Sequence, residues 1–165
     1  MRPGYVAATV IGLLIVLVSW PAGKPVVVWN ATESAPLGLY LVTGKQSFTR
    51  GELVVARLPE RAARLAAQRA YLPLGDPVVK QVGAMSGDEV CSTNNAIAIN
   101  GQRVALRLTA DKEGRPLPSW RGCLRLHRDQ VLLLTARVPD SFDGRYFGPT
   151  RRDAIIGKAI PLWTW

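Results

Sequence analysis

Ser34 lies in the stretch ATESAPLGLY, residues 31–40, where small residues, a proline and a glycine follow the apolar run PVVVW. Such a turn can hold a hydroxyl exposed and fixed in position, although serine is also common there as a plain turn former. A serine is a weak nucleophile unless a base takes its proton, and histidine is the usual base. The single histidine, His127, lies far away in the charged stretch RLHRDQ. If Ser34 does chemistry, its base is therefore another residue.

Lys80 is a candidate base because it lies in the valine-rich stretch DPVVKQVGAM, residues 76–85. The alternation of a β-strand places Val78, Lys80 and Val82 on one face, and valines on both faces predict that apolar side chains cover the lysine at least in part. Burial lowers the pKa of an ammonium group. A drop of about three units would leave enough neutral amine at pH 7 to accept a serine proton. The alternative is a lysine that blocks edge-to-edge pairing of strands.

Composition argues for one ordered domain and against a nucleic-acid partner. The chain has 165 residues, of which 48% are hydrophobic and 20% charged, so disorder is not expected. The net charge is +9, but the 21 Lys and Arg are scattered, with no basic run longer than a pair such as Arg151-Arg152. No group of aromatic residues on which nucleic-acid bases could stack lies among these Lys and Arg residues. A solubilising surface or attraction to anionic lipid explains the charge instead.

The N-terminal segment has the character of a membrane span. No charged residue occurs from residue 3 to residue 23, and YVAATVIGLLIVLVSW is almost wholly apolar. A helix of about 20 residues at 1.5 Å each crosses a hydrocarbon core. We expect residues 1–23 to be a membrane anchor or uncleaved signal, and residues 24–165 to form an exported domain. A cleaved signal peptide is the alternative, but Trp20 and Pro21 fit poorly where small residues are needed.

Cys91 and Cys123 are the two cysteines of the chain. Two cysteines in an exported domain most often form a disulfide, and two unrelated buried thiols are the alternative. A zinc site needs four ligands, and two cysteines with one histidine are too few. We expect no metal and no cofactor.

The order of elements predicts a mostly β domain of barrel or coiled-sheet type. The stretch AIAINGQRVALRL, residues 96–108, predicts a hairpin in which Asn100-Gly101 forms a type I′ turn. Residues 59–71, rich in Ala and Arg with Pro59 at the start, predict the one convincing helix after the N-terminal segment. Further strands are expected over 24–30, 39–44, 51–58, 76–85, 129–138 and 154–165, and loops over 110–122 and 139–149.

Four sequence boxes in order resemble those of bacterial type I signal peptidases, especially the TraF-type maturation peptidases of conjugative plasmids. They are the serine box TESAPLGLY, the strand opening GELVV, the lysine box KQVGAMSGDEV and the late box SFDGRYFG. With the N-terminal anchor, the resemblance covers essentially the whole chain. It implies a signal-peptidase or LexA-like fold of coiled β-sheets with an SH3-like barrel element, one short helical insertion and an N-terminal transmembrane helix.

The resemblance also implies roles for the residues of the boxes. Ser34 would be the nucleophile and Lys80 the general base. Ser141 would hydrogen-bond to the Lys80 amine and orient it. The Ser34 backbone N–H and the Thr32 hydroxyl would stabilise the oxyanion.

Asp143 and Arg145 would form a supporting charged pair near the site. The chain departs from the general signal-peptidase pattern at three points: Ala35 replaces a methionine, the proline, here Pro36, comes one position early, and Gly144 replaces a serine. The first two suggest a reshaped substrate pocket and favour the TraF-type branch. Ser86 of the lysine box lies where proline is common and is not a second nucleophile.

The implied function is a membrane-anchored serine endopeptidase of the cytoplasmic membrane, with its catalytic domain in the periplasm. Its substrate would be a pilin precursor or other preprotein, bound as an extended strand with small residues filling shallow pockets. In some TraF-type enzymes the pilin's own amino terminus takes the acyl group, which gives a cyclic subunit. Components of a conjugation or type IV secretion apparatus are implied as partners.

Three other functions remain open. A general type I signal peptidase would remove leaders from many preproteins, and a non-catalytic envelope component of a conjugation apparatus would keep Ser34 and Lys80 as remnants. A LexA-like self-cleaving regulator shares the Ser/Lys chemistry, but the apolar N-terminus and the absence of a DNA-binding segment argue against it.

Overall fold

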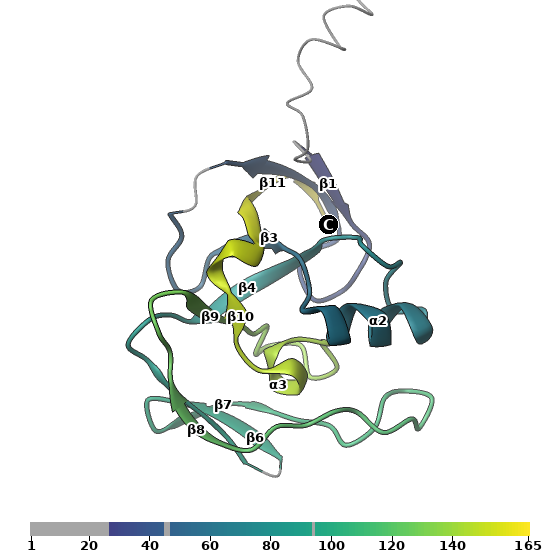
Figure 1. Ribbon diagram of the computed structural model, residues 1–165. Helices are drawn as coiled ribbons and strands as arrows, with labels where there is room; N and C mark the ends of the chain where they lie inside the picture. The colour runs from purple at the N-terminus through teal and green to yellow at the C-terminus, as the bar shows by residue number, and fades with distance from the viewer. Residues whose placement is uncertain (1–26, 45–46, 94) are drawn as a thin grey trace, which may run out of the picture.

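The computed structural model describes residues 27–44, 47–93 and 95–165, which form two antiparallel sheets and little helix (Figure 1). The mostly β architecture expected from the sequence is therefore confirmed. The predicted anchor, residues 1–23, lies outside the described residues. Within the described ranges, no helix is both long enough and apolar enough to cross a bilayer.

The larger sheet has seven strands and carries the serine and lysine boxes. Its C-terminal strand pairs with the second and third strands, so the last residues of the chain connect the N-terminal hairpin to the centre of the sheet. In spatial order the strands are β1 (Val27–Asn30), β2 (Gly38–Thr43), β11 (Ile155–Thr164), β3 (Leu53–Ala56), β4 (Val78–Ala84), β9 (Gln130–Leu133) and β10 (Thr150–Arg151).

The smaller sheet has four strands, in the order β7 (Gln102–Leu106), β6 (Ala96–Ile99), β5 (Glu89–Ser92) and β8 (Gly122–Arg125). The β6–β7 hairpin matches the prediction, and Asn100 and Gly101 have the positive φ values of 50° and 80° that a type I′ turn requires. The sequence analysis missed β5 and β8. Both are short and only partly buried, so neither shows a clear apolar alternation.

The core lies on both sides of the strands that carry the lysine box. One cluster joins the smaller sheet to the end of β9 through Val90, Ile97 and Leu132, all of them fully buried. A second cluster packs Val54 and Val82 against neighbouring apolar side chains. Because such side chains leave water on folding, each stabilises the fold by roughly 1.5–3 kcal/mol. The middle of β4 is consequently held in a dry, close-packed interior.

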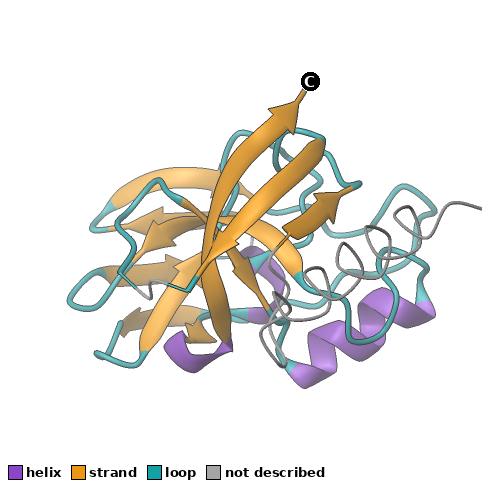
Figure 2. Ribbon diagram, turned by 90° about the horizontal axis from the view of Figure 1, so that it is seen from above, coloured by secondary structure: helices purple, strands orange, loops and turns teal. Residues whose placement is uncertain are grey.

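The predicted helix is present as α2 (Glu60–Gln68), which begins after Pro59 and buries Ala62 and Ala66. It ends earlier than the expected residue 71, because Ala70 adopts a left-handed backbone with φ of 56°. Figure 2 shows α2 as the longest helix drawn in purple, at one side of the strands.

The late box contains a short helix where a loop was expected. Helix α3 (Gly144–Phe147) follows Asp143, whose carboxylate accepts a hydrogen bond from the Arg145 backbone N–H. A four-residue helix has no detectable 3.6-residue periodicity, so sequence pattern cannot show it. A 3-10 turn, η1 (Arg152–Ala154), then leads from β10 into β11.

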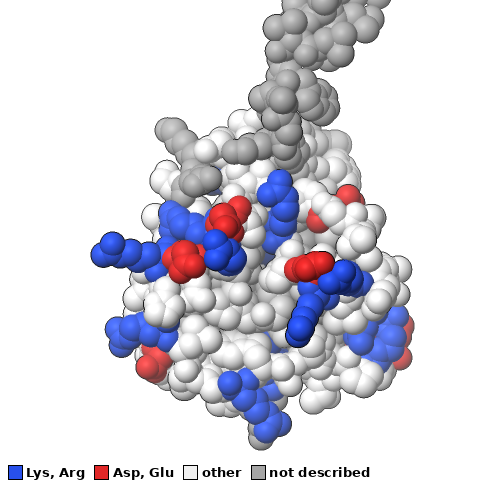
Figure 3. Space-filling model, in the orientation of Figure 1, with Lys and Arg blue, Asp and Glu red and all other residues white. Residues whose placement is uncertain are grey.

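Charged side chains are mixed on the face shown in Figure 3, where the Lys and Arg groups are separate and several lie beside Asp or Glu. Ion pairs such as Arg50–Asp88 and Arg64–Glu60 join surface cations to carboxylates. The positive charge is therefore not gathered into one stripe on this face.

Candidate active site

The serine box forms a loop between β1 and β2 that is organised by Asn30. The Asn30 side chain is buried, and its Nδ2 lies 2.8, 3.0 and 3.1 Å from the carbonyl oxygens of Thr32, Ala35 and Pro36. The Tyr40 hydroxyl donates to the Pro36 carbonyl at 2.7 Å. The sequence analysis missed Asn30, although an asparagine that opens a turn often bonds to the following backbone.

Ser34 is only 5% exposed, which corrects the expectation of an exposed hydroxyl. Its Oγ lies 3.0 Å from Thr32 Oγ1, and Thr32 Oγ1 donates to Asn30 Oδ1 at 2.9 Å. Because the Thr32 hydroxyl has one proton and gives it to Asn30, the Ser34 hydroxyl is the donor to Thr32. The loop thus buries Ser34 and fixes its hydroxyl through a relay of two hydrogen bonds.

Lys80 lies in the middle of β4, paired with Val54 of β3, and is 4% exposed. Since β4 is flanked by β3 and β9, the reading of Lys80 as an edge-protecting residue is wrong. Its Nζ donates to Ser141 Oγ at 3.0 Å. Burial lowers the pKa of Lys80 to about 8, helped by the Arg145 charge and opposed by the carboxylates of Asp143 and Asp140.

Asp143 and Arg145 form a fully buried ion pair behind the lysine, with Arg145 Nε 2.8 Å from Asp143 Oδ1. The guanidinium also donates to the carbonyls of Leu106, Pro139 and Thr135 at 3.0, 2.9 and 2.9 Å. Asp143 accepts a further bond from the Thr135 backbone N–H at 3.0 Å. The pair therefore fixes the backbone segment from residue 135 to residue 145, which carries Ser141.

Gly144 separates the members of this ion pair, and the packing explains why no side chain stands there. A Cβ at this position would lie 2.8 Å from the Leu133 carbonyl oxygen and 2.7 Å from Leu132 Cδ1. A serine would require β9 or α3 to move. The departure from the general signal-peptidase pattern at residue 144 is thus matched by close approach of the backbone.

A pocket of about 310 Å³ brings the predicted site residues together. Thr32, Ser34, Lys80 and Ser141 all line it, whereas Asp143 and Arg145 do not. Ser34 Oγ is hydrogen-bonded to Thr32, and Lys80 Nζ to Ser141. Among the hydrogen bonds of the described residues, none joins Ser34 directly to Lys80. The site has a serine and a low-pKa lysine facing one cavity, with each held by a separate partner.

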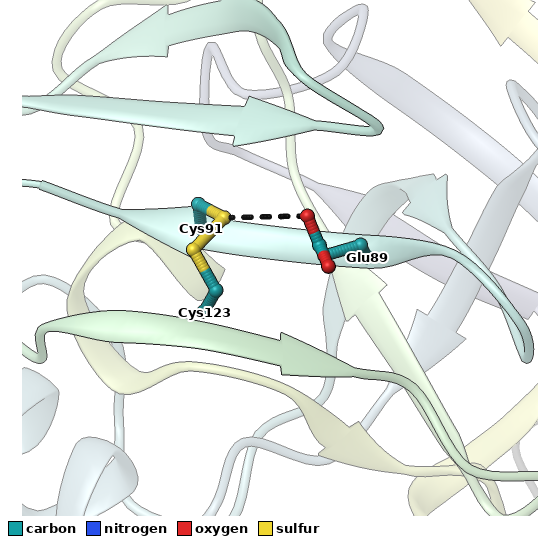
Figure 4. Close-up of side chains that lie close together, drawn as sticks. All are labelled: Glu89, Cys91 and Cys123. Atoms are coloured by element: carbon teal, nitrogen blue, oxygen red, sulfur yellow. Dashed lines mark hydrogen bonds between the residues drawn. A yellow bond between two sulfur atoms is a disulfide. The ribbon is translucent and has the colours of Figure 1, made fainter.

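The remaining candidates lie elsewhere. Cys91 and Cys123 are joined in a disulfide between β5 and β8, with Glu89 beside them (Figure 4). These three residues are close enough to suggest metal ligands, but sulfurs bound to each other offer no thiolate. His127 is exposed and does not line the pocket.

Comparison with known proteins identifies the class. The family model described as "Signal peptidase, peptidase S26" matches residues 3–164. The chain belongs to this family of serine peptidases, and within it to the TraF-type members, which confirms the resemblance seen in the sequence.

Three relatives illustrate this similarity. The chain is 34% identical over 172 residues to a plasmid transfer protein TraF of Escherichia coli, covering 98% of this chain and 94% of that protein. A second Escherichia coli protein with the same description is 34% identical over 163 residues, covering 93% and 90%. A conjugal transfer protein TraF of Agrobacterium fabrum is 32% identical over 146 residues, covering 82% and 81%.

Among solved structures, a signal peptidase I from Enterococcus faecalis is similar with a TM-score of 0.40 and 17% sequence identity. The match covers 68% of this chain and 96% of that one.

Proposed function

We propose that the protein is a membrane-anchored serine endopeptidase in which Ser34 is the nucleophile and Lys80 the general base. The observation that carries the proposal is that a buried lysine with a pKa of about 8 lines the same pocket as a buried, fixed serine. At that pKa about one amine in ten is neutral at pH 7, roughly 300 times the fraction of an ordinary lysine. Such an amine can take a serine proton without histidine.

The proton has to move between two hydrogen-bond networks. Ser34 Oγ turns from Thr32 towards neutral Lys80 as the substrate fills the pocket, and Lys80 Nζ takes its proton while Oγ bonds to the scissile carbonyl carbon. The carbonyl electron pair moves onto oxygen. When that oxyanion collapses, the C–N bond breaks and the Lys80 ammonium protonates the departing amine. Water, or an incoming amine, then attacks the acyl-enzyme while Lys80 takes its proton. When this second intermediate collapses, the bond from the acyl carbon to Ser34 Oγ breaks and the Lys80 ammonium returns a proton to Oγ.

The oxyanion would be stabilised by the Ser34 backbone N–H and the Thr32 hydroxyl. Loss of one such donor typically costs about 3–4 kcal/mol of barrier. The Thr32 proton is bonded to Asn30 Oδ1 at 2.9 Å, so Thr32 has to rotate once Ser34 leaves it. Asn30 then holds the loop through its bonds to backbone carbonyls while the Ser34 hydroxyl turns to Lys80 and the Thr32 hydroxyl turns to the oxyanion.

Ser141 and the buried pair have supporting roles in this scheme. Ser141 Oγ accepts from Lys80 Nζ at 3.0 Å and so fixes the direction of the amine. Asp143 and Arg145 hold the segment that bears Ser141. We therefore assign them as positioning residues, since neither lines the pocket.

The substrate we propose is a pilin precursor, bound as an extended strand and either cleaved or joined to its own amino terminus. The relatives' names, plasmid transfer and conjugal transfer proteins, support a role in conjugation. Edge-strand binding supplies main-chain hydrogen bonds and leaves alternate side chains to enter pockets. Conjugation or type IV secretion components are the partners that this role requires.

Location at the periplasmic face of the cytoplasmic membrane is part of the proposal. The disulfide suits an oxidising compartment, and residues 1–23 are apolar enough to anchor the chain. Trp29 of β1 and Trp165 lie 5.4 Å apart between ring centroids, Trp163 lies 5.2 Å from Trp165, and all three are strongly exposed. Figure 1 shows the C-terminus close to β1. Tryptophan is favoured at membrane–water interfaces.

The test is processing of the pilin precursor in cells that carry Ser34→Ala or Lys80→Ala. Each variant should abolish maturation while the protein remains folded and inserted. Ser86→Ala, an exposed serine of the same lysine box, is the matched control and should process normally. Full maturation by both site variants would favour the non-catalytic envelope component, and complementation of a leader-peptidase deficiency would favour the general signal peptidase.

A further inference from the structure

Asn30 stands at the base of the loop that carries Ser34. It is the last residue of β1 and pairs with Gly38, the first residue of β2, so residues 31–37 form the loop between them. Asn30 is only 4% exposed. A polar side chain buried to this degree destabilises the fold unless its donors and its acceptor are paired.

The amide nitrogen of Asn30 binds backbone carbonyls on both sides of Ser34. Its Nδ2 lies 2.8 Å from the Thr32 carbonyl oxygen, and 3.0 and 3.1 Å from those of Ala35 and Pro36. These contacts hold the backbone before and after the Ser34 N–H, the group that we assign to the oxyanion. The nitrogen half of the amide therefore shapes the loop.

The amide oxygen of Asn30 binds a single residue, Thr32, at two points. Oδ1 accepts from the Thr32 backbone N–H at 3.3 Å and from Thr32 Oγ1 at 2.9 Å. The first bond fixes the backbone of Thr32 and the second fixes its side-chain torsion, which leaves Thr32 Oγ1 3.0 Å from Ser34 Oγ. The oxygen half of the amide therefore sets where the second oxyanion donor lies.

No other short side chain does both. The reversed amide would turn its NH₂ group towards the Thr32 N–H and its oxygen towards three carbonyls, so only one orientation satisfies every group. An ionised aspartate has no donor for the carbonyls, and a serine or threonine has a single hydroxyl proton. Asparagine at residue 30 is thus matched both to the loop backbone and to Thr32.

We propose that Asn30 is a positioning residue of the active site and that it acts on the reaction through Thr32. Its amide oxygen keeps the Thr32 hydroxyl beside Ser34, from where that hydroxyl turns to the oxyanion, and its amide nitrogen holds the loop. The inference rests on the proposed peptidase function and adds to it a residue outside the four sequence boxes. Loss of the nitrogen should lower the free energy of unfolding, whereas loss of the oxygen should lower kcat.

The test is a double-mutant cycle that combines Asn30→Ala with Thr32→Val in the full chain in detergent. The substrate is a fluorogenic peptide, selected from a library because the wild type cuts it and Ser34→Ala does not. We expect Asn30→Ala to lower kcat about 100-fold, with KM changed by no more than about threefold, because a catalytic donor is misplaced. In Thr32→Val, which already lacks the hydroxyl, the same substitution should lower kcat by less than about tenfold.

Tyr40→Phe is the matched control for the cycle. The Tyr40 hydroxyl donates to the Pro36 carbonyl at 2.7 Å, the same carbonyl that Asn30 binds, and among the described residues it has no hydrogen bond to Thr32. Its removal should lower kcat by one and the same small factor with and without the Thr32 hydroxyl.

Equal factors for Asn30→Ala in the two backgrounds would mean that Asn30 acts only through the fold, which overturns the inference and leaves the proposed function standing. If Asn30→Ala does not fold, Asn30→Asp decides, because it keeps an acceptor for Thr32 and lacks the amide donor. A kcat within about tenfold of the wild type, at a lowered free energy of unfolding, supports the inference, and a loss of about 100-fold overturns it. If Ser34→Ala cuts every peptide that the wild type cuts, the proposed function and the role of Asn30 fall together.

Discussion

Lys80 Nζ lies 3.0 Å from Ser141 Oγ, although 61 positions separate the two residues in the chain. Both side chains are 4% exposed. The contact joins the centre of β4 to the segment that the buried Asp143–Arg145 pair holds in place. A lysine that packing alone would leave free to turn therefore presents its amine to the pocket in one direction.

Peptidase activity should depend on pH through Lys80. Since only the neutral amine accepts the Ser34 proton, and its pKa is lowered to about 8, kcat/KM should rise about tenfold per pH unit below 8 and level off above it. The measurement is cleavage of a fluorogenic peptide from pH 6 to pH 10, with the fold monitored by circular dichroism. A rate that keeps rising beyond pH 9.5 would show an ordinary lysine and contradict the assignment.

The free energy of unfolding should also depend on pH through Lys80, because burying its charged form destabilises the fold. A lowered pKa means that the folded state binds fewer protons than the unfolded state between about pH 8 and the ordinary lysine pKa of 10.5, so the free energy of unfolding should rise through that window. Below pH 8 the full penalty of burying the ammonium applies. Lys80→Met removes it and should stabilise the fold by about 3 kcal/mol at pH 7, measured by urea unfolding. Equal stability of the two proteins at pH 7 would argue against a buried charge.

Ser141→Ala should lower kcat and leave KM nearly unchanged. The substitution removes the acceptor that orients Lys80 Nζ but does not empty the pocket, and misplacement of a catalytic group costs on the order of 100-fold. Ser141→Thr retains the hydroxyl and should recover most of the rate. Steady-state kinetics of both variants, beside the exposed Ser86→Ala, measure the effect; a change in KM alone would indicate that Ser141 acts in substrate binding.

Asp143→Asn should destabilise the domain by about 3–5 kcal/mol, because it leaves the fully buried Arg145 guanidinium without its counter-charge. Urea unfolding at pH 7 measures the loss. The matched control is Asp153→Asn, which breaks an exposed pair with Arg151 and should change the free energy of unfolding very little. Equal effects of the two substitutions would mean that burial does not set the strength of the inner pair.

Replacing both Cys91 and Cys123 by serine should cost about 3–4 kcal/mol of unfolding free energy, because the bridge closes a loop with a sequence separation of 32. Activity of the folded variant should persist, since neither cysteine lines the pocket. Thiol labelling with and without reductant tests the bridge itself. Labelling of both cysteines without reductant would contradict it.

Local patterns in the sequence predicted most of the strands and the helix after Pro59. Valine-rich runs and the Asn100-Gly101 turn act through neighbouring residues, so their effect can be read along the chain. Where the apolar pattern was weak or the element short, as in β5, β8 and α3, pairing with distant segments determined the structure. The early end of α2 at Gln68 likewise follows from the left-handed backbone of Ala70 and not from the expected stop near Pro73.

The sequence by itself determined the family, through its four ordered boxes, and the residue types able to do the chemistry. Only the tertiary structure decided that Ser34 is buried and bonded to Thr32, that Lys80 lies in an interior strand, and that both line one pocket. The physical reason is that a pKa and a cavity depend on which atoms replace water around a group. Those atoms come from segments that are distant in the chain, and their approach is a property of the whole fold.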